Sequence, residues 1–388
     1  MVGNGRSVHV AGRSAALAAR GHSVRLVTLG PTLDAPGVDV RTRPIPAGLP
    51  AAMRAARGFL SDVRSFAPEV LHLHYAGGKL GTMATLADVR PFVVTVMGGD
   101  VLPEQHPGGM SWLERRATRR ILQAADLVLV KSEALRQAMV AFGPLDARIE
   151  TVRWGVDRTI FRRDPVAAAA LRARLGLAPG DRVLLSPRTL APLYNVHLIA
   201  EALPAVRARV PAALLLVTEH AADSAYRRRV EETAAALGVA SRVRFIGRIE
   251  HREMPALYSL AEVVVSVPSS DGLPQSLFEA MACAVPTVLG RLPAYEEVVR
   301  DGETAVLADL QPAALASAIL RLLENPAGAS EVARAASSRV REVADLPTEL
   351  ARVEGFYQRA LSSARPYRRS WAARVGDIAG LVARTRPQ

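Results

Sequence analysis

The sequence predicts an α/β protein whose parallel sheets are covered by helices on both faces. Short runs of branched apolar residues alternate with alanine-rich helical segments, a pattern typical of strands that are buried on both faces. The pattern occurs twice, with the linker GVDRTIFRRDP at 155–165 between the two sets. Ligands of such sheets collect at the carboxyl ends of the strands. We therefore expect two doubly wound halves that face a cleft.

Each expected strand is rich in Val, Leu or Ile and is bounded by turn-forming or polar residues. The first set covers 23–29, 70–75, 92–97, 127–131 and 149–154, and the second covers 183–187, 213–219, 243–247, 263–267 and 286–290. The length of 388 residues suits two or three domain-sized units. We place the domain boundaries at 1–158 and 159–350, followed by a basic helical tail at 351–388.

The net charge of +12 is concentrated at the two ends of the chain. Residues 1–158 carry 20 basic and 13 acidic groups, residues 351–388 carry 8 and 2, and the middle carries 21 and 22. No zinc-ligand spacing, helix-turn-helix signature or aromatic RNA-binding motif accompanies this charge, so a nucleic-acid partner is not expected.

The segment SWLERRATRRIL at 111–122 predicts a basic amphipathic helix. Its arginines share one arc, with Leu113, Ala117, Ile121 and Ala124 opposite them: Arg115, Arg116, Arg119 and Arg120. Such an arc is either a contact for an anionic membrane surface, together with the tail at 365–386, or an ordinary solvated helix face.

The chain has no apolar run near the ~18 residues of a membrane span and opens on MVGNGRSVHV, without the apolar core of a signal peptide. Its single cysteine, Cys283, cannot form an internal disulfide and is interpreted as buried packing rather than as a nucleophile. We expect a cytoplasmic protein, either free or peripheral on the inner face of the membrane.

The stretch SSDGLPQSLFEAMACAVPT at 269–287 places two carboxylates around a Gly-Leu-Pro turn that opens a helix. Pro274 suits the first helical position, and Pro286 stops the helix. Free N–H groups at such a helix start attract phosphate. Asp271 can accept hydroxyl hydrogen bonds, and Glu279 can accept a vicinal pair such as that of a ribose. On spacing alone, helix capping and a solvated surface acid explain the two carboxylates equally well.

These segments resemble the retaining glycosyltransferases of the GT-B fold, of the family 4 or group 1 type. RGHSVRLVTLG at 20–30 resembles the second strand of that family's first domain, and WGVDRTIF at 154–161 resembles its interdomain Asn-Gly-Val-Asp segment with Trp154 in place of Asn. Residues 242–290 are similar to its nucleotide-sugar half almost position by position. The resemblance implies transfer of a sugar from a nucleotide diphosphate-sugar to a glycan or lipid-linked acceptor. It also implies retention at the anomeric carbon, no metal or other cofactor, and a final helix that crosses back to the first domain.

The resemblance also implies roles for individual residues. Glu279 matches the second acid of the family's Glu-x7-Glu motif, which binds the donor ribose, and Asp271 matches the first, which contacts the donor sugar. Arg188 matches the arginine that neutralises the diphosphate and assists its departure. The remaining donor contacts are implied through the backbone, at Ile249 for the base, at Gly272, Leu273 and Pro274 for sugar and phosphate, and at Gly3 and Gly5 for phosphates and reacting sugar.

Three departures from the family pattern bear on activity. Asp271 is one methylene shorter than the usual glutamate, which puts the donor in doubt. The lysine that normally follows the arginine is absent, and Tyr194 and Asn195 occupy its region. The chain opens inside the glycine-rich loop, so the first strand of the first domain is expected to be missing, and we hypothesise that the true start codon lies upstream of Met1.

In the first half, the run MGGD at 97–100 follows an expected strand. Met97 replaces a histidine that contacts the donor sugar in many family members, and Asp100 is expected either to serve catalysis in the cleft or to cap the next helix. His72 and His74 point to one face of their strand. They are either polar side chains at the strand end or two ligands of a metal ion, for which no third ligand is evident in the sequence. Lys79 lies in a loop that resembles an acceptor-side loop and is either an anion contact or a solvated lysine. Lys131 and Ser132 follow another strand and are further candidates for the cleft.

Two other classes of function remain open on the sequence. A catalytically weak pseudoenzyme or scaffold accounts for the shortened acid, the absent lysine and the missing strand, and it predicts donor binding without nucleotide release. A nucleotide-sugar epimerase of the same architecture predicts conversion of the donor without an acceptor.

Overall fold

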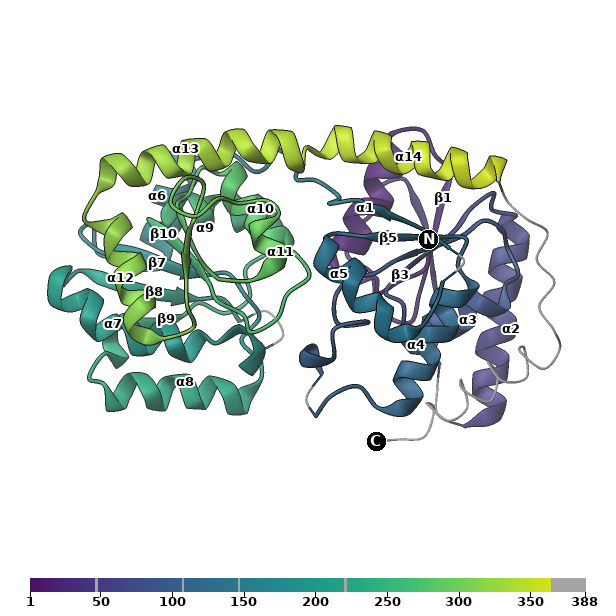
Figure 1. Ribbon diagram of the computed structural model, residues 1–388, viewed down its shortest axis with the longest axis horizontal. Helices are drawn as coiled ribbons and strands as arrows, with labels where there is room; N and C mark the ends of the chain where they lie inside the picture. The colour runs from purple at the N-terminus through teal and green to yellow at the C-terminus, as the bar shows by residue number, and fades with distance from the viewer. Residues whose placement is uncertain (46–47, 107, 146, 220–221, 364–388) are drawn as a thin grey trace. The chain divides into compact units, whose positions relative to one another are not determined.

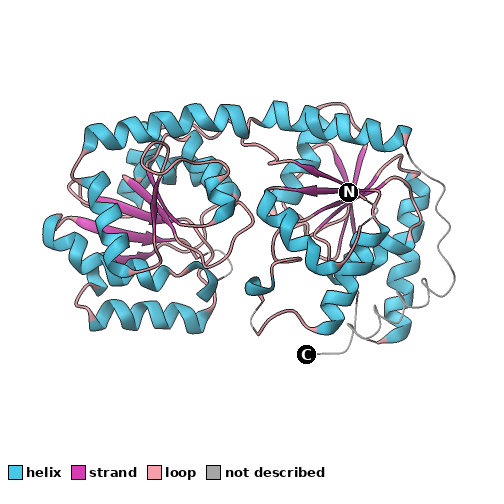
Figure 2. Ribbon diagram, in the orientation of Figure 1, coloured by secondary structure: helices cyan, strands magenta, loops and turns pink. Residues whose placement is uncertain are grey.

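The computed structural model describes residues 1–45, 48–106, 108–145, 147–219 and 222–363. The chain forms two compact units. Unit 1 contains residues 1–154 and the segment that begins at Glu349, and unit 2 contains residues 155–348. In each unit, helices lie on both sides of parallel strands (Figure 1 and Figure 2). The predicted fold class, with two doubly wound parallel sheets, is confirmed.

The strands of unit 1 are β1 (Val24–Thr28), β2 (Val38–Thr42), β3 (Leu71–His74), β4 (Phe92–Thr95), β5 (Leu127–Val130) and β6 (Arg148–Thr151). Its helices are α1 (Val8–Ala19), α2 (Leu49–Phe66), α3 (Gly78–Leu86), α4 (Trp112–Ala124), α5 (Glu133–Ala138) and most of α14 (Leu346–Ser362). The strands form a β1-β2 pair and a β3-β4-β5-β6 sheet, parallel throughout. All five strands expected in this half are present, and β2 is an additional one.

The first three residues lie between β1 and β3 and join the two parts of the sheet. The Val2 amide donates to the His72 carbonyl at 2.8 Å, the His74 amide donates to the Val2 carbonyl at 2.8 Å, and the Val27 amide donates to the Met1 carbonyl at 3.0 Å. The innermost position, where we expected a missing strand, thus holds a short segment with Val2 as an isolated bridge residue. The upstream start codon stays a prediction.

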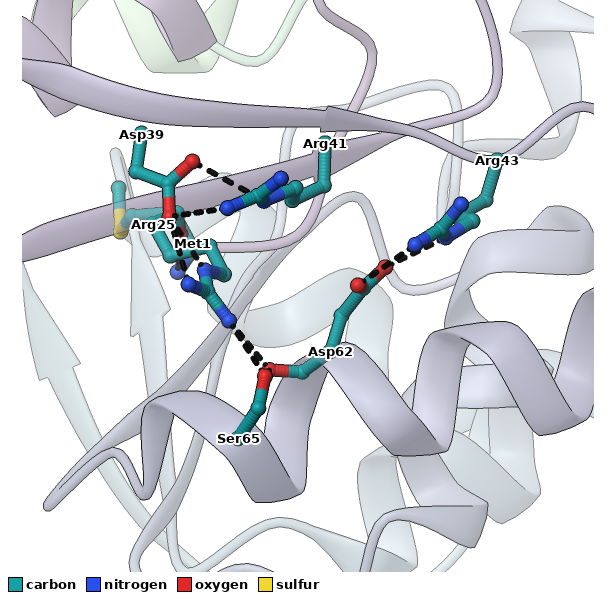
Figure 3. Close-up of polar contacts among 7 residues, drawn as sticks. All are labelled: Met1, Arg25, Asp39, Arg41, Arg43, Asp62 and Ser65. Carbon is teal, nitrogen blue, oxygen red and sulfur yellow. Dashed lines mark hydrogen bonds and ion pairs between the residues drawn. The ribbon is translucent and has the colours of Figure 1, made fainter.

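Arginine side chains connect β1 and β2 to α2 at the outer edge of this sheet (Figure 3). Arg25 on β1 donates to the Asp39 carboxylate on β2 at 2.7 Å and to the Asp62 carbonyl on α2 at 2.7 Å. Arg43 makes two hydrogen bonds to the Asp62 carboxylate, at 2.5 and 2.7 Å. These bonds fix the edge strand to the helix that covers it.

Helix α14 packs on unit 1 although it follows unit 2 in the sequence. Its apolar side chains share a buried cluster with the sheet, composed of Val93, Leu127, Leu129, Val152, Trp154, Val353, Phe356 and Ala360. The Glu349 carboxylate accepts a hydrogen bond from the Arg153 amide at 2.5 Å, so both ends of the chain contribute to unit 1. The tail at 365–386 lies outside the described residues.

The strands of unit 2 are β7 (Arg182–Ser186), β8 (Ala213–Val217), β9 (Val243–Phe245), β10 (Val263–Ser266), β11 (Thr287–Gly290) and β12 (Val306–Ala308). Its helices are α6 (Pro165–Arg174), α7 (Val196–Arg209), α8 (Ser224–Ala236), α9 (Met254–Leu260), α10 (Gln275–Ala282), α11 (Pro293–Glu296), α12 (Pro312–Leu323) and α13 (Pro326–Val343). All five strands expected here are present, and β12 is an additional one.

The strand order in unit 2 is β12-β11-β10-β7-β8-β9, and all neighbouring pairs are parallel. This is the order of a dinucleotide-binding sheet, in which successive crossovers reverse direction between β7 and β10. A crevice forms at such a reversal, outside the carboxyl ends of the two strands. The residues that follow β7 and β10 therefore occupy the expected binding position of unit 2.

Candidate functional site

Two predicted site residues follow the two strands at the reversal point of unit 2. Arg188 comes two residues after β7, and Asp271 comes five residues after β10. The two strands are neighbours, with Val263 opposite Leu184. The side chains of Arg188 and Asp271 meet there although 83 positions separate them in the sequence.

The turn from Asp271 to α10 has an unusual backbone. Leu273 is fully buried and adopts φ +79°, a left-handed conformation that costs an ordinary L-residue roughly 1–2 kcal/mol. Pro274 is the N-cap residue and α10 begins at Gln275, one position later than the proline pattern predicts. Strain of this kind persists where the surroundings impose it, as at binding loops. The turn delivers the amino end of α10 next to Arg188, since Arg188 Nη1 donates to Ser276 Oγ at 3.3 Å.

Besides Ser276, two further side chains contact Arg188. Its Nη2 donates to Asp271 Oδ2 at 2.6 Å, and its guanidinium lies 4.6 Å from the centre of the Tyr194 ring. The Tyr295 hydroxyl donates to the same Asp271 oxygen at 3.0 Å. Burial is the largest single influence and lowers the pKa of Arg188, but Asp271, Tyr295 and Tyr194 together raise it by more, so the net direction is upward. The guanidinium is therefore a permanent, oriented cation.

Glu279 lies on α10 with 5% of its surface exposed and two donors on its carboxylate. The Tyr258 hydroxyl donates to Oε2 at 2.9 Å, and His251 Nε2 lies 3.0 Å from Oε1. Burial, and then the Glu279 carboxylate, raise the pKa of Tyr258 well above its usual range. The hydrogen bond to Glu279 raises the pKa of His251. Glu279 is thus neither a solvated acid nor a helix cap.

Other predicted positions of unit 2 lie in loops at the same strand ends. Ile249 is half-buried in the loop after β9. The Gly247 amide of this loop donates to Glu219 Oε2 at 2.9 Å, just after the end of β8. Asn195 Nδ2 donates to the Val267 carbonyl at 3.0 Å and to Ser269 Oγ at 2.8 Å. In place of a second cation, this chain thus has an amide that fixes the loop before Asp271.

In unit 1, Asp100 is 1% exposed and its carboxylate accepts backbone hydrogen bonds. The donors are the amides of Ala76 at 2.7 Å, Met97 at 3.0 Å and Gly98 at 2.9 Å. Burial raises the pKa of Asp100, although these amides oppose the shift. The carboxylate connects the loop after β3 to the loop after β4, a contact that neither sequence alternative described.

Gly3 and Gly5 lie in the loop between the first residues and α1. The Gly5 amide donates to Thr28 Oγ1 at 2.9 Å, and a Cβ at Gly5 would lie 2.4 Å from Thr32 Oγ1. A Cβ at Gly3 would lie 3.3 Å from the Cβ of His74. Close packing, against Val10 and His74 at Gly3 and against Thr28 and Thr32 at Gly5, therefore accounts for a glycine at each position.

The two histidines of β3 are buried and stacked, with ring centroids 4.3 Å apart. His72 Nδ1 lies 2.5 Å from the Tyr357 hydroxyl and His72 Nε2 lies 2.7 Å from Thr95 Oγ1, so both ring nitrogens are engaged. Across the part of the chain that the structure describes, no group of three or more His, Cys, Asp or Glu residues is arranged to hold a metal ion. Of the other candidates of this unit, Lys131 is buried, Ser132 caps α5 by accepting from the Leu135 amide at 3.2 Å, and Lys79 is half-buried on α3.

Comparison with known proteins decides the family. The family described as glycosyl transferases group 1 matches residues 168–342, and the glycosyl transferase 4-like domain matches residues 4–155. The chain is 30% identical over 416 residues to a D-inositol 3-phosphate glycosyltransferase of Acidothermus cellulolyticus, and the match covers 93% of this chain and 87% of the relative. The chain belongs to the group 1 glycosyltransferases.

Two further likenesses place this group 1 glycosyltransferase among known proteins. It is 34% identical over 259 residues to a GDP-mannose-dependent alpha-(1-6)-phosphatidylinositol monomannoside mannosyltransferase of Mycolicibacterium smegmatis, over 64% of each chain, which is under two thirds of the relative's length. A solved structure of Anabaena Alr3699/HepE in complex with UDP-glucose superposes with a TM-score of 0.80 at 18% identity, over 92% of this chain and 99% of that one. The second likeness shows the fold.

The basic helix of this glycosyltransferase, α4, differs from its predicted pattern in one respect. A capping box formed by Ser111 and Glu114 starts it, and its exposed residues include Arg116 and Arg119. Leu113, which we expected on the inner face, is 48% exposed beside Trp112, which is 68% exposed. The prediction for Leu113 is wrong because the first turn of the helix extends beyond the core, and the buried residues of α4 are Thr118, Ile121, Leu122 and Ala124.

Several site residues of the glycosyltransferase are not apparent from the sequence alone. Tyr194 was noted only as an occupant of the lysine's region, and Tyr258, Tyr295, His251 and Ser276 were not singled out. They carry no motif signal, because each is defined by its distance to Arg188, Asp271 or Glu279 in space. One usable signal was the placement of Tyr258 and His251 just before β10, in a family whose base-binding loop precedes that strand.

Proposed function

We propose that this chain transfers a sugar from a nucleotide diphosphate-sugar to a glycan or lipid-linked acceptor, with retention at the anomeric carbon and without a metal ion. The observation that carries the proposal is the buried Arg188 guanidinium at the reversal point of unit 2, oriented by Asp271 next to the amino end of α10. A fixed cation and free helix amides form a site for a departing diphosphate.

The groups of the site have different tasks in this proposal. Arg188 and the first amides of α10 neutralise the charge that develops on the diphosphate as its bond to the sugar breaks. Glu279, oriented by Tyr258 and His251, accepts the ribose hydroxyls. Asp271 orients Arg188 and offers its remaining oxygen to a sugar hydroxyl. Ile249 and the backbone of 272–274 line the base and the sugar.

The relatives suggest a class of substrate. One is named for GDP-mannose and a phosphatidylinositol monomannoside, and another for inositol 3-phosphate. We therefore propose an acceptor that carries a phosphorylated polyol, free or lipid-linked. In unit 1, we propose that Asp100 positions the loops after β3 and β4 rather than contacting the reacting atoms, because its carboxylate is already bound by three amides.

The proposal is tested by nucleotide diphosphate release from UDP-, GDP- and ADP-sugars, with and without a lipid extract. We expect acceptor-dependent release from one donor, unaffected by EDTA, with the donor's anomeric configuration kept in the product. Glu279→Ala should raise the KM for that donor about tenfold or more, as expected for lost hydrogen bonds to a charged group. Glu303→Ala, which removes an exposed acid of the same unit, is the control.

The other classes of function give different results in the same assay. Donor binding without any release identifies a scaffold, and conversion of the donor without an acceptor identifies an epimerase. Equal release by wild type and Glu279→Ala removes the site assignment itself.

A second part of the proposal concerns the membrane. Trp112 and Leu113 present apolar surface beside the arginines of α4, the composition of an interfacial helix that lies on anionic lipid. No helix among the described residues combines the length and apolar character needed to cross a membrane. We expect Trp112→Ser and Arg116→Ser to reduce cosedimentation with phosphatidylglycerol vesicles, and Arg54→Ser on α2 to reduce it less. Binding that ignores salt or lipid charge contradicts this part.

A further inference from the structure

Among the described residues of unit 1, one buried cation has no carboxylate in contact with it. Arg13 lies on the inner face of α1 with 6% of its surface exposed. In the described part of the chain its guanidinium contacts the face of Trp154, 4.2 Å from the ring centre, the Met97 sulfur at 3.5 Å and His74 Nδ1 at 3.4 Å. None of these groups carries a negative charge. Burial accordingly lowers the pKa of Arg13 to about 9.

The neighbours of Arg13 are also donors without acceptors. Since Arg13 donates to His74 Nδ1, that nitrogen is an acceptor, and the proton of the neutral ring lies on Nε2. Burial and the neighbouring cations lower the pKa of His74 well below its usual range, which keeps the ring neutral. His74 Nε2 and Trp154 Nε1 are both buried without a hydrogen-bond partner in the described structure. The two rings lie 5.4 Å apart.

This excess of buried donors and positive charge destabilises the folded protein unless an acceptor binds beside them. A buried donor without an acceptor is destabilising, and a buried charge without a partner more so. Nearby polar groups do not relieve it, because His72 is engaged with Tyr357 and Thr95. A cluster composed of a cation and two free donors lacks only an acceptor, preferably an anionic one.

The cluster lies where a ligand is expected in unit 1. With the segment 1–3 as the innermost strand, crossovers in one direction lead to β1 and β2, and crossovers in the other lead to β3 and beyond. The reversal point is therefore between Gly3 and the end of β3, which is His74. A Cβ at Gly3 would lie 3.0 Å from the Val10 side chain and 3.3 Å from the Cβ of His74, so the loop that follows the segment passes directly beside the histidine.

We propose that Arg13, His74 Nε2 and Trp154 Nε1 form an anion-binding subsite for the phosphate of the acceptor. This assignment rests on the proposed function for the nature of the acceptor, but the anion site itself is defined by the donors. A phosphate oxygen accepts from a guanidinium and from neutral N–H groups alike. The residues act in binding the acceptor and not in breaking the donor bond.

The experiment measures binding of inorganic phosphate, inositol 3-phosphate and GDP to the full chain by calorimetry at constant ionic strength. We expect Arg13→Met to weaken phosphate and inositol 3-phosphate binding about tenfold or more, the loss of one charge-assisted contact, and to leave GDP binding unchanged. Arg54→Met, an exposed arginine of α2, should bind all three like wild type. Arg13→Met should also be at least as stable as wild type, since methionine replaces an unpaired buried charge.

Other results overturn the proposal. Phosphate binding that Arg13→Met leaves intact, or no phosphate binding by wild type, removes the subsite, and GDP binding that falls in parallel assigns the cluster to the donor instead. If Arg13→Met does not fold, Trp154→Phe decides, because it removes one donor without a change in charge. It should weaken phosphate binding several-fold, and unchanged binding contradicts the proposal. These are binding measurements, so they stand even if no sugar transfer is found.

Discussion

Arg188 Nη2 and Asp271 Oδ2 lie 2.6 Å apart, a buried ion pair that joins the end of β7 to the turn before α10. The family resemblance assigned these residues to two different parts of the donor. Their contact indicates a shared task, in which Asp271 determines where the guanidinium points. This contact explains an aspartate in place of the family's usual glutamate, because the Asp271 carboxylate binds both the Arg188 guanidinium and the Tyr295 hydroxyl.

Removal of Asp271 should destabilise unit 2. Asp271→Ala leaves Arg188 as an unpaired buried cation, a change that typically costs about 3–5 kcal/mol. Asp271→Asn keeps an acceptor and should cost less. Urea unfolding measures both, with Asp309→Ala as the control because that exposed acid lies 3.9 Å from its nearest arginine nitrogen. Equal stability of Asp271→Ala and wild type would show that the pair is open in solution.

Arg188 should be essential for turnover rather than for donor binding alone. Loss of a preorganised donor to a developing charge typically lowers kcat about 100- to 1,000-fold, and we expect this of Arg188→Met. Arg188→Lys keeps the charge but loses the planar guanidinium and its stacking on Tyr194. Its kcat should therefore lie between those of wild type and Arg188→Met. Steady-state nucleotide release from the preferred donor is the measurement. A rise in KM with unchanged kcat contradicts a role in leaving-group departure.

The contact between His251 and Glu279 predicts a pH dependence of stability. Because the folded pKa of His251 is raised by its hydrogen bond to Glu279, the protonated ring stabilises the fold below the unfolded value of about 6.5. That contribution is lost as the pH rises through the folded pKa. The free energy of unfolding should therefore fall between pH 6 and pH 9 by more in wild type than in Glu279→Gln or His251→Gln. Parallel curves for all three proteins refute the coupling.

Cys283 should be inert in the folded protein. It is fully buried, and burial first and then the Glu279 carboxylate raise the pKa of its thiol to about 12. Because the thiolate is the reactive form, labelling by a disulfide reagent at pH 8 should be negligible in buffer and complete in urea. Rapid labelling of the native protein would mean that α10 opens readily.

The sequence was sufficient for the framework of the fold because burial on both faces leaves a continuous apolar signal. All ten expected strands are present, whereas β2 and β12 were not predicted. β2 (Val38–Thr42) is half polar and partly exposed, and β12 (Val306–Ala308) has three residues. Neither segment is long or apolar enough to stand out, and pairing with a neighbour in space, β1 or β11, makes each a strand.

Only those residues of the site that local sequence or a family motif marks could be predicted. Asp271 and Glu279 could be found because they lie on either side of a recognisable turn that opens a helix, and Arg188 because it matches an arginine of the family. The partners that orient them, Tyr194, Tyr295, Tyr258 and His251, are set by tertiary packing. The same holds for Arg13, a charged residue on an alanine-rich helix whose burial against Trp154 no periodicity reveals.

Asp100 offers a test that separates a structural carboxylate from a catalytic one. Its oxygens accept from three backbone amides, so Asp100→Ala leaves several buried N–H groups without an acceptor, each worth about 1–3 kcal/mol. We expect a large loss of stability in urea, while Asp34→Ala, an exposed acid in a loop, should change little. Asp100→Asn keeps one oxygen acceptor and should retain most of its turnover wherever it remains folded. A folded Asp100→Asn protein whose kcat falls by orders of magnitude, with donor binding intact, would instead place this carboxylate among the reacting groups.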